Sequence, residues 1–382
     1  MKIKAEDIDV SYEEAIRIAP PNLRKKIQHS VELIRKAEKI ALMHDPDNGY
    51  FNTFSGGKDS QALFHIVKMS GVKFKTYMSL TSVDPGDVIR FVKTEYPSVI
   101  RQKPKMSIFQ KAVERGILPT MRVRWCCADF KESAGAGEVT LIGIRAEESA
   151  RRARRHEVEV SNKKFSGNLD EFENWSKSEI GRKQKKMKRK LNEDEFSVKT
   201  DNEVRCINGK DSMLISPIFD WTEKDVWYFL NNIVKAPHCK LYDEGYKRIG
   251  CILCPMSQPK YKRMEIKRFP HVKRNWIEAI KKIRMGGGYC KARIYTRAIH
   301  TGRTFGHRYT REWFNDARDG FRLLPQREIY GEIEKIRGNV QPRKFIYPAW
   351  VRYNENWVFG QPYVRWRRCR AIYGGGNRRG NL

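Results

Sequence analysis

Apolar residues along the chain follow two spacings, one typical of helices and the other typical of strands. Residues 22–44 carry apolar side chains at helical spacing and follow Pro20-Pro21, which marks the start of a helix. Short runs of β-favouring residues predict strands at 50–54, 73–81, 139–144 and 214–219. Helical patterns lie between and after them, at 61–67, 87–95, 107–116, 223–230 and 261–285. This alternation predicts an α/β fold with a doubly wound, mostly parallel sheet that helices cover on both faces.

The turn after the first strand is rich in glycine and polar groups. It reads Ser55-Gly56-Gly57-Lys58-Asp59-Ser60 and leads into a helical pattern. The glycines allow a tight turn and a close approach of a ligand, and the N-terminus of the helix presents free N–H groups to an anion. The stretch therefore predicts a phosphate site at the carboxyl end of a parallel strand. It is not a Walker A loop, because Asp59 rather than Ser or Thr follows Lys58. An ordinary strand-to-helix turn is the alternative.

Charge is the most unusual bulk property of the sequence. The chain has 382 residues, 40 % of them hydrophobic, with a net charge of +31 and a pI near 9.9. This charge predicts an anionic partner, and nucleic acid, DNA or RNA, is the first candidate. A solvated basic surface and sites for small phosphates are the alternatives.

The sequence also bears on the compartment. No apolar run approaches the roughly 20 residues that span a membrane. Residues 1–7 lack an apolar signal region. We therefore expect a cytoplasmic protein without a membrane partner, in which thiols stay reduced.

Composition divides the chain into three expected parts. These are an N-terminal helical segment at 1–48, a nucleotide-binding domain at 49–258 and a basic, aromatic-rich C-terminal extension at 259–382. The polar stretch at about 161–202 contains a lysine- and arginine-rich run. It predicts an exposed insertion, helical in part, that either tracks a phosphate backbone or forms a solvated face.

The C-terminal extension interleaves aromatic rings with cations. This pattern occurs at 345–353 and at 363–368, and it suits either stacking on bases or a small β-type cap whose rings pack on the core. The glycine-rich tail at 374–380 is expected to be disordered.

Two pairs stand out among the eight cysteines. Cys126 and Cys127 are adjacent, and Cys251 and Cys254 form a Cys-x-x-Cys. Four thiolates suit tetrahedral zinc or an iron–sulfur cluster equally well by count. Three cysteines have no partner pattern, and burial is their default: Cys206, Cys239 and Cys290. Cys369 lies between arginines that would lower its pKa, and it is expected to pack in the fold or lie at the surface, with a reactive thiol as the alternative. Cys239, beside His238, is also a candidate sulfur relay.

Several of these motifs resemble those of known nucleotide enzymes. The loop at 55–60 resembles the pyrophosphate-binding PP-loop of the adenine nucleotide alpha-hydrolase superfamily. The two cysteine pairs are similar to the signature of the phosphoadenosine phosphosulfate (PAPS) reductase family, in its iron–sulfur branch. Three further motifs resemble that family in the same order: Gly143-Ile144-Arg145-Ala146-Glu147-Glu148-Ser149, Pro217-Ile218-Phe219-Asp220-Trp221-Thr222 and Leu241-Tyr242-Asp243-Glu244-Gly245-Tyr246. Apart from the insertion, the resemblance covers about 49–255.

This resemblance implies a set of site residues. It implies a [4Fe–4S] cluster held by Cys126, Cys127, Cys251 and Cys254, with Lys131 near it. It implies an adenine nucleotide, ATP or a sulfonucleotide (PAPS or adenosine phosphosulfate), bound by Ser55, Gly56, Gly57, Lys58, Asp59, Ser60, Arg145, Glu148 and Arg152. Mg²⁺ would bridge the phosphates, with Asp59 as a candidate ligand. The catalytic candidates are Lys58, Asp59, Lys131 and Arg145.

Two departures from the family pattern favour one activity over another. The chain lacks the C-terminal Glu-Cys-Gly-Leu-His segment of sulfonucleotide reductases, and its loop has the form found in ATP-cleaving members. The combination resembles the sulfur-inserting enzymes of DNA phosphorothioation and implies adenylation followed by sulfur transfer to nucleic acid. Leu80-Thr81-Ser82 replaces the family's Asp-Thr-Gly, which puts the purine contacts in doubt.

Two alternatives remain open at this point. One is a sulfonucleotide reductase that releases sulfite with electrons from a thioredoxin-type reductant. The other is a nucleic-acid-binding protein with an inactive nucleotide site.

Overall fold

The computed structural model describes residues 3–121, 123–161, 164–188 and 211–285, and two short stretches at 350–353 and 356–359. Contacts divide the chain into two units, Met1–Leu323 and Leu324–Leu382. In the second unit, the described residues form an antiparallel hairpin of β8 (Trp350–Tyr353) and β9 (Asn356–Phe359). The predictions for 363–368 and for the tail lie outside the described residues.

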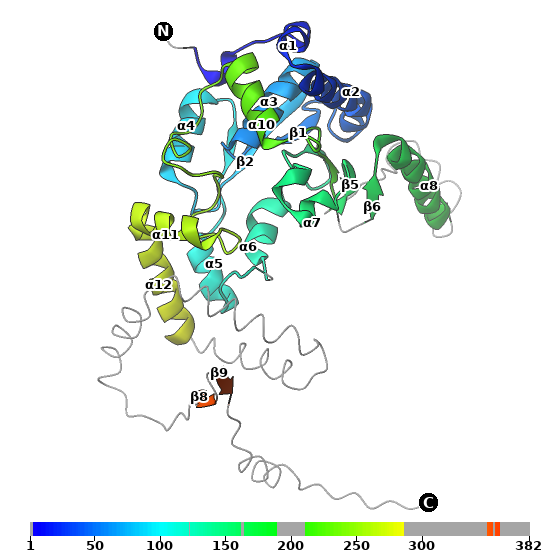
Figure 1. Ribbon diagram of the computed structural model, residues 1–382. Coiled ribbons are helices and arrows are strands. Elements are labelled where there is room, and N and C mark those ends of the chain that lie inside the picture. Colours follow the sequence, from blue (N-terminus) through cyan, green and yellow to red (C-terminus); the bar gives the residue numbers. More distant parts are fainter. Residues whose placement is uncertain are drawn as a thin grey trace, which may run out of the picture. The chain divides into compact units, whose positions relative to one another are not determined.

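A seven-stranded sheet forms the centre of the first unit (Figure 1). Its strands are β1 (Tyr50–Thr53), β2 (Phe74–Ser79), β3 (Ile100–Gln102), β4 (Val139–Leu141), β5 (Val158–Val160), β6 (Phe165–Gly167) and β7 (Met213–Ile215). The order is β3-β2-β1-β4-β7-β5-β6. The first five strands in this order are parallel, and β5 is antiparallel to both of its neighbours. The predicted mostly parallel α/β fold is confirmed.

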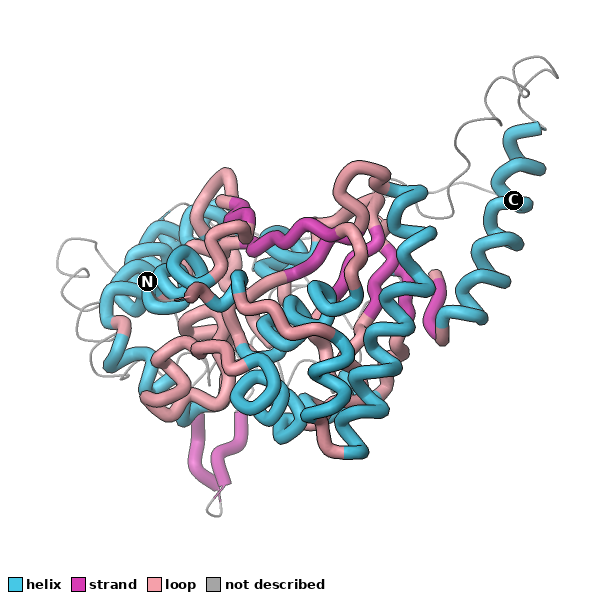
Figure 2. Tube along the Cα trace, turned by 90° about the horizontal axis from the view of Figure 1, so that it is seen from above, coloured by secondary structure: helices cyan, strands magenta, loops and turns pink. Residues whose placement is uncertain are grey.

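Helices flank the strands of this sheet (Figure 2). The longer ones are α1 (Tyr12–Ile18), α2 (Pro21–His44), α3 (Lys58–Ser70), α4 (Gly86–Glu95), α5 (Ile108–Arg115), α8 (Leu169–Lys188), α10 (Glu223–Tyr228), α11 (Pro259–Arg268) and α12 (Pro270–Met285). The short helices and turns are η1 (Ala5–Asp7), α6 (Trp125–Cys127), η2 (Ala128–Glu132), η3 (Ala146–Glu148), α7 (Ala150–Ala153) and η5 (Phe229–Val234). None of the described helices is long and apolar enough to cross a membrane.

Local sequence explains where several helices begin. Pro21 starts α2, whose buried face includes Leu23, Ile27 and Ile34. Reciprocal side-chain caps begin α5 at Ser107 and α10 at Thr222. Because β1 and β4 are neighbours, the loop that follows β1 and the segment that follows β4 meet at the same edge of the sheet.

Two sequence predictions about these elements were wrong in detail. The stretch 261–285 is not one helix but two, α11 and α12, because Pro270 has no backbone N–H and disfavours helical geometry at Phe269. No strand was predicted at the start of the insertion, but β6 pairs there with β5 and extends the sheet by one strand. The insertion is helical in part, as α8, and residues 189–210 lie outside the described part of the chain.

Candidate active site

The loop 55–60, which we call the phosphate loop, joins β1 to the N-terminus of α3. Its shape is fixed internally: the Ser60 hydroxyl accepts the Ser55 N–H at 3.1 Å and donates to the Gly57 carbonyl at 2.8 Å. Gly56 has a φ of +71°, and a Cβ there would lie 2.7 Å from Cγ1 of Val88 on α4. At this position only glycine fits without strain. A Cβ on Gly57 would meet nothing closer than 3.4 Å.

Two buried cations meet at this loop. Nε of Arg145, from the segment after β4, lies 2.6 Å from Oδ1 of Asp59. Nζ of Lys58 lies 3.6 Å from Oδ2 of the same carboxylate and 3.5 Å from Oε1 of Glu223. Both cations are 3 % exposed. The structure thus places three of the predicted catalytic residues in one ion-pair group at the N-terminus of α3.

Tyr242, which is distant from the phosphate loop in sequence, contacts that loop at Lys58. Its hydroxyl accepts the backbone N–H of Lys58 at 2.8 Å, and its ring lies 5.8 Å from Nζ of the same lysine. Burial raises the pKa of Tyr242, so the hydroxyl stays protonated. The sequence motif at 241–246 predicted family membership but gave this tyrosine no role.

A group of arginines lies beside the phosphate loop. Glu148 forms ion pairs with Arg152 and, at 3.5 Å, with Arg248. Burial and the positive charge of Arg248 lower the pKa of Arg152 to about 10, while Asp59 acts in the opposite direction. The predicted nucleotide ligands Glu148 and Arg152 are therefore close to Asp59. Arg248 is an addition that only the structure shows, and such a concentration of cations favours an anionic ligand.

The four predicted cysteine ligands come together in space. Nη2 of Arg124 donates to Sγ of Cys127 at 3.1 Å. Hydrogen bonding from Cys126 and Arg124 lowers the pKa of Cys127 to about 5. Burial raises the pKa of Cys254, and charges on Cys251 and Cys127 raise it further. The adjacent pair and the Cys-x-x-Cys therefore interact across a long sequence separation.

Cys126, Cys127, Cys251 and Cys254 are called the cysteine group from here on, and Lys131 is the second cation beside it. Although desolvation of its ammonium group opposes the charge, the thiolate of Cys251 and the carboxylate of Asp84 raise the pKa of Lys131. The replaced family segment also lies here, since Oγ1 of Thr81 is 3.4 Å from Sγ of Cys251. Leu80-Thr81-Ser82 thus contacts the cysteine group.

The donor set fits thiolate ligation of a cluster. Four sulfurs gather beside two cations, Arg124 and Lys131, which offset the negative charge that thiolate ligands bring. In the described part of the chain, no three His, Cys, Asp or Glu side chains converge closely enough to hold a single metal ion. In a four-iron cluster, each iron takes its own cysteine, so the ligands need not converge on one point.

The turn of the Cys-x-x-Cys is held from two sides. Leu253 has a φ of +57°, which is costly for a residue with a side chain. Its N–H donates to Oε2 of Glu265 on α11 at 2.7 Å, and the N–H of Ile252 donates to the Val83 carbonyl at 2.8 Å. Burial raises the pKa of Glu265 to about 7. The sequence offered no signal for Glu265, because it stands alone in a basic helix.

Comparison of the sequence with known proteins identifies the family of this chain. A model of the phosphoadenosine phosphosulfate reductase domain matches residues 49–257. The chain belongs to this family. The predicted family resemblance is therefore confirmed.

Individual relatives of this PAPS reductase family member are distant. Two uncharacterized proteins of Methanocaldococcus jannaschii are each 24 % identical to it, over 70 % and 73 % of this chain. The chain spans only 47 % and 60 % of their respective lengths. A solved phosphoadenylyl-sulfate reductase from Candida auris, in a phosphate complex, is 15 % identical with a TM-score of 0.35, covering 61 % of this chain and 95 % of that one.

Proposed function

We propose that this PAPS reductase family member is an enzyme that binds ATP at the phosphate loop, adenylates an acceptor and then supports transfer of sulfur to it. The observation that carries this proposal is the group of Lys58, Asp59 and Arg145 at the N-terminus of α3. Backbone N–H groups, a helix dipole and two buried cations are what a triphosphate requires. The loop has the Lys-Asp form of ATP-cleaving enzymes.

The first step would be transfer of AMP. The phosphates would contact the phosphate loop, Lys58 and Arg145, and Asp59 would hold a Mg²⁺ ion, which supplies positive charge beside the phosphates. An oxygen of the acceptor attacks the α-phosphorus, the bond from that phosphorus to the α,β-bridging oxygen breaks, and pyrophosphate leaves. The residues contribute position and positive charge near the departing phosphates.

The cysteine group would serve the second half of the reaction. Cys126, Cys127, Cys251 and Cys254 would hold a [4Fe–4S] cluster, with Lys131 and Arg124 stabilising their thiolate charge. Such a cluster supplies a carrier for sulfur or electrostatic support. Displacement of AMP by a sulfur nucleophile from a donor then completes the exchange of oxygen for sulfur on the acceptor.

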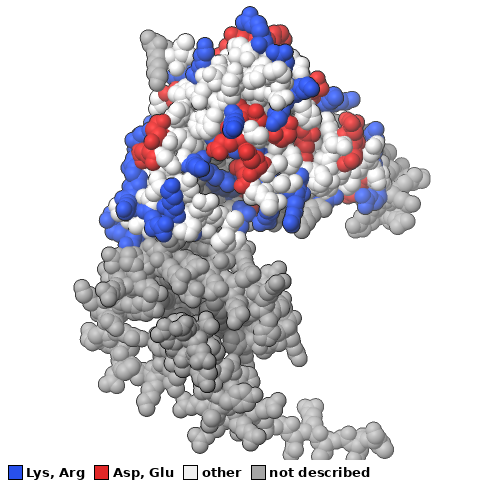
Figure 3. All heavy atoms as spheres, viewed as in Figure 1, with Lys and Arg blue, Asp and Glu red and all other residues white. Residues whose placement is uncertain are grey.

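A nucleic acid is the proposed acceptor. Helices α11 and α12, which follow the Cys-x-x-Cys directly, carry ten lysines and arginines against two glutamates. Lys260, Arg263 and Lys267 are exposed along one side of α11, whereas Glu265 is buried. Figure 3 shows lysines and arginines gathered at the lower left, over these two helices. Such a surface next to the cysteines favours a polyanionic backbone.

Product analysis tests this function directly. Anaerobically purified protein is offered ATP, or PAPS in a separate reaction, with single-stranded DNA or RNA at low salt. AMP and pyrophosphate support adenylation, sulfite would show the sulfonucleotide reductase instead, and absence of any product would leave a binding protein. Nucleic-acid affinity is measured in parallel at several salt concentrations. We expect it to fall steeply as salt rises, because each neutralised phosphate releases counterions.

A further inference from the structure

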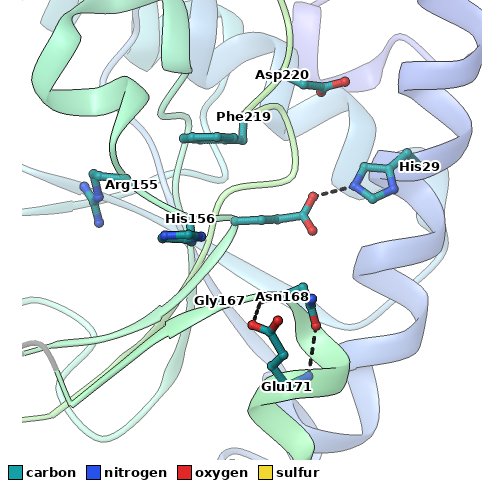
Figure 4. A pocket seen from close by; sticks show the side chains of 9 residues that line it. His29, Arg155, His156, Gly167, Asn168, Glu171, Phe219 and Asp220 are labelled. Atoms are coloured by element: carbon teal, nitrogen blue, oxygen red, sulfur yellow. Dashed lines mark hydrogen bonds and ion pairs between the residues drawn. The ribbon is translucent and has the colours of Figure 1, made fainter.

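A cavity of about 530 Å³ lies apart from the phosphate loop and the cysteine group (Figure 4). Its walls come from α2, from the segment before β5, from the junction of β6 with α8 and from the turn after β7. The Ser216 N–H donates to the Glu157 carbonyl at 2.9 Å, which puts the cavity at the carboxyl end of β7. The Phe219 carbonyl accepts the Ala146 N–H at 2.8 Å. One wall is thus continuous with the segment that carries Arg145.

Flat side chains border this cavity on two sides. Figure 4 shows the rings of Phe219 and His156 edge-on, on either side of the same space, with Arg155 at its end. Arg155 forms an ion pair with Glu159, so its charge is largely balanced within the protein. Two ring faces that border one space suit a planar ligand, which gains stacking contact on both sides.

A carboxylate lines the same cavity. Oε1 of Glu157 lies 2.5 Å from Nε2 of His29 on α2, which orients the carboxylate. This hydrogen bond raises the pKa of His29. Glu171 and Asp220 add further negative charge to the lining. In a chain of net charge +31, a pocket with three carboxylates selects a ligand that donates hydrogen bonds.

We propose that this cavity binds a nucleobase with an exocyclic amino group, within a single-stranded polynucleotide. The ring would stack between Phe219 and His156 and donate from its amino group to Glu157, as carboxylates do toward the amino group of cytosine. A polynucleotide is favoured over a free nucleotide because Arg151 and Arg154, both exposed, stand just before the cavity residues in sequence and offer phosphate contacts beside it. This inference rests on the proposed nucleic-acid acceptor and gives it a base preference.

Paired pyrimidine oligonucleotides test the proposal, because thymine lacks the amino group that cytosine has. Affinities of the full-length protein for oligo(dC) and oligo(dT) of equal length are measured by fluorescence anisotropy. We expect oligo(dC) to bind about 10-fold more tightly, in line with one hydrogen bond to a carboxylate. Glu157→Gln should reduce this ratio toward one. The matched control Glu13→Gln, an exposed glutamate of α1, makes the same change of charge and should preserve the ratio.

A second variant separates stacking from hydrogen bonding. Phe219→Leu keeps apolar volume but removes the flat ring, so it should weaken both oligonucleotides about five-fold or more while melting near the wild-type temperature. Equal affinity for oligo(dC) and oligo(dT) would overturn the base site yet leave nucleic-acid binding intact. Loss of all oligonucleotide binding in the wild type would instead overturn the proposed acceptor. Binding of CMP as tightly as oligo(dC) would contradict the polynucleotide assignment.

Discussion

The hydroxyl of Tyr242 accepts the backbone N–H of Lys58 at 2.8 Å, the N–H with which α3 begins. This contact joins the phosphate loop to the segment that leads into Cys251 and Cys254. Nζ of Lys58 also donates to the Lys247 carbonyl, at 3.2 Å, in the same segment. A phosphate that takes the Lys58 N–H must displace the tyrosine hydroxyl. Nucleotide binding at this loop, as proposed above, would therefore be linked to the position of the cysteine-bearing segment.

Tyr242→Phe should tighten the binding of pyrophosphate and of ATP. The variant keeps the ring against Trp227, 5.0 Å away between centroids, but removes the group that competes for the N–H. We expect a gain of about 1 kcal/mol, or roughly five-fold in affinity, measured by calorimetry. Weaker binding would mean that the hydroxyl donates to the ligand rather than competing with it.

The two glycines of the phosphate loop should respond differently to substitution. Gly56→Ala forces a Cβ against Val88 at positive φ and should lower the free energy of unfolding by about 1–3 kcal/mol. Gly57→Val meets nothing closer than 3.4 Å at its Cβ, so it should fold but bind ATP poorly, because the side chain occupies the approach to the backbone. Denaturant unfolding and calorimetry distinguish the two. Normal ATP binding by a folded Gly57→Val protein would argue against phosphates at this loop.

Lys58→Ala should weaken ATP binding by about 1.5–3 kcal/mol, roughly 10- to 150-fold, through loss of one charge-assisted contact. Lys111→Ala is the control, since Lys111 pairs with Glu114 on α5. Calorimetry with ATP and with PAPS gives the comparison. Tight binding of PAPS together with weak binding of ATP would favour the sulfonucleotide reductase.

Replacement of any one of Cys126, Cys127, Cys251 or Cys254 by serine should remove most of the iron from anaerobically prepared protein. The wild type should hold about four irons per chain and absorb broadly in the visible range. Cys239→Ser is the control, because Cys239 is 1 % exposed and outside the predicted ligand set. Metal analysis decides between the alternatives, and stoichiometric zinc without iron would exclude the cluster.

Glu265→Gln should change how stability depends on pH. The pKa of Glu265 is about 7 in the folded protein, against about 4.3 for an unperturbed glutamate. The folded state therefore binds the proton more tightly, and this contribution to stability, complete below about pH 4, is lost as the pH rises through 7. The urea midpoint of the wild type should fall more between pH 5.5 and pH 7.5 than that of Glu265→Gln, whose amide oxygen still accepts the Leu253 N–H. Equal falls would show that Glu265 does not titrate in this range.

Sequence alone determined the parts of this protein that depend on local pattern. Apolar spacing and caps located α2, α5 and α10, and the strand–glycine–helix order at 50–67 located the phosphate loop. Helix starts, turns and amphipathic faces depend on interactions among a few neighbouring residues, so the local spacing of apolar residues, glycine and proline is enough to predict them. Strands β3, β5 and β6 were missed: each has only three residues, too few to show an alternating pattern, and none lies in a longer run of apolar residues like those that revealed β4 and β7.

Only the tertiary structure decided which distant groups meet. Cys126 and Cys254, Tyr242 and Lys58, and Glu265 and Leu253 are brought together by strand order and by the packing of α11, and no local spacing records such pairings. The same holds for the cavity beside Phe219, whose walls come from four separate segments. Sequence motifs indicate which chemical groups a chain contains. The order and connections of the strands determine which of these groups lie close together, because contacts between distant segments depend on the whole fold.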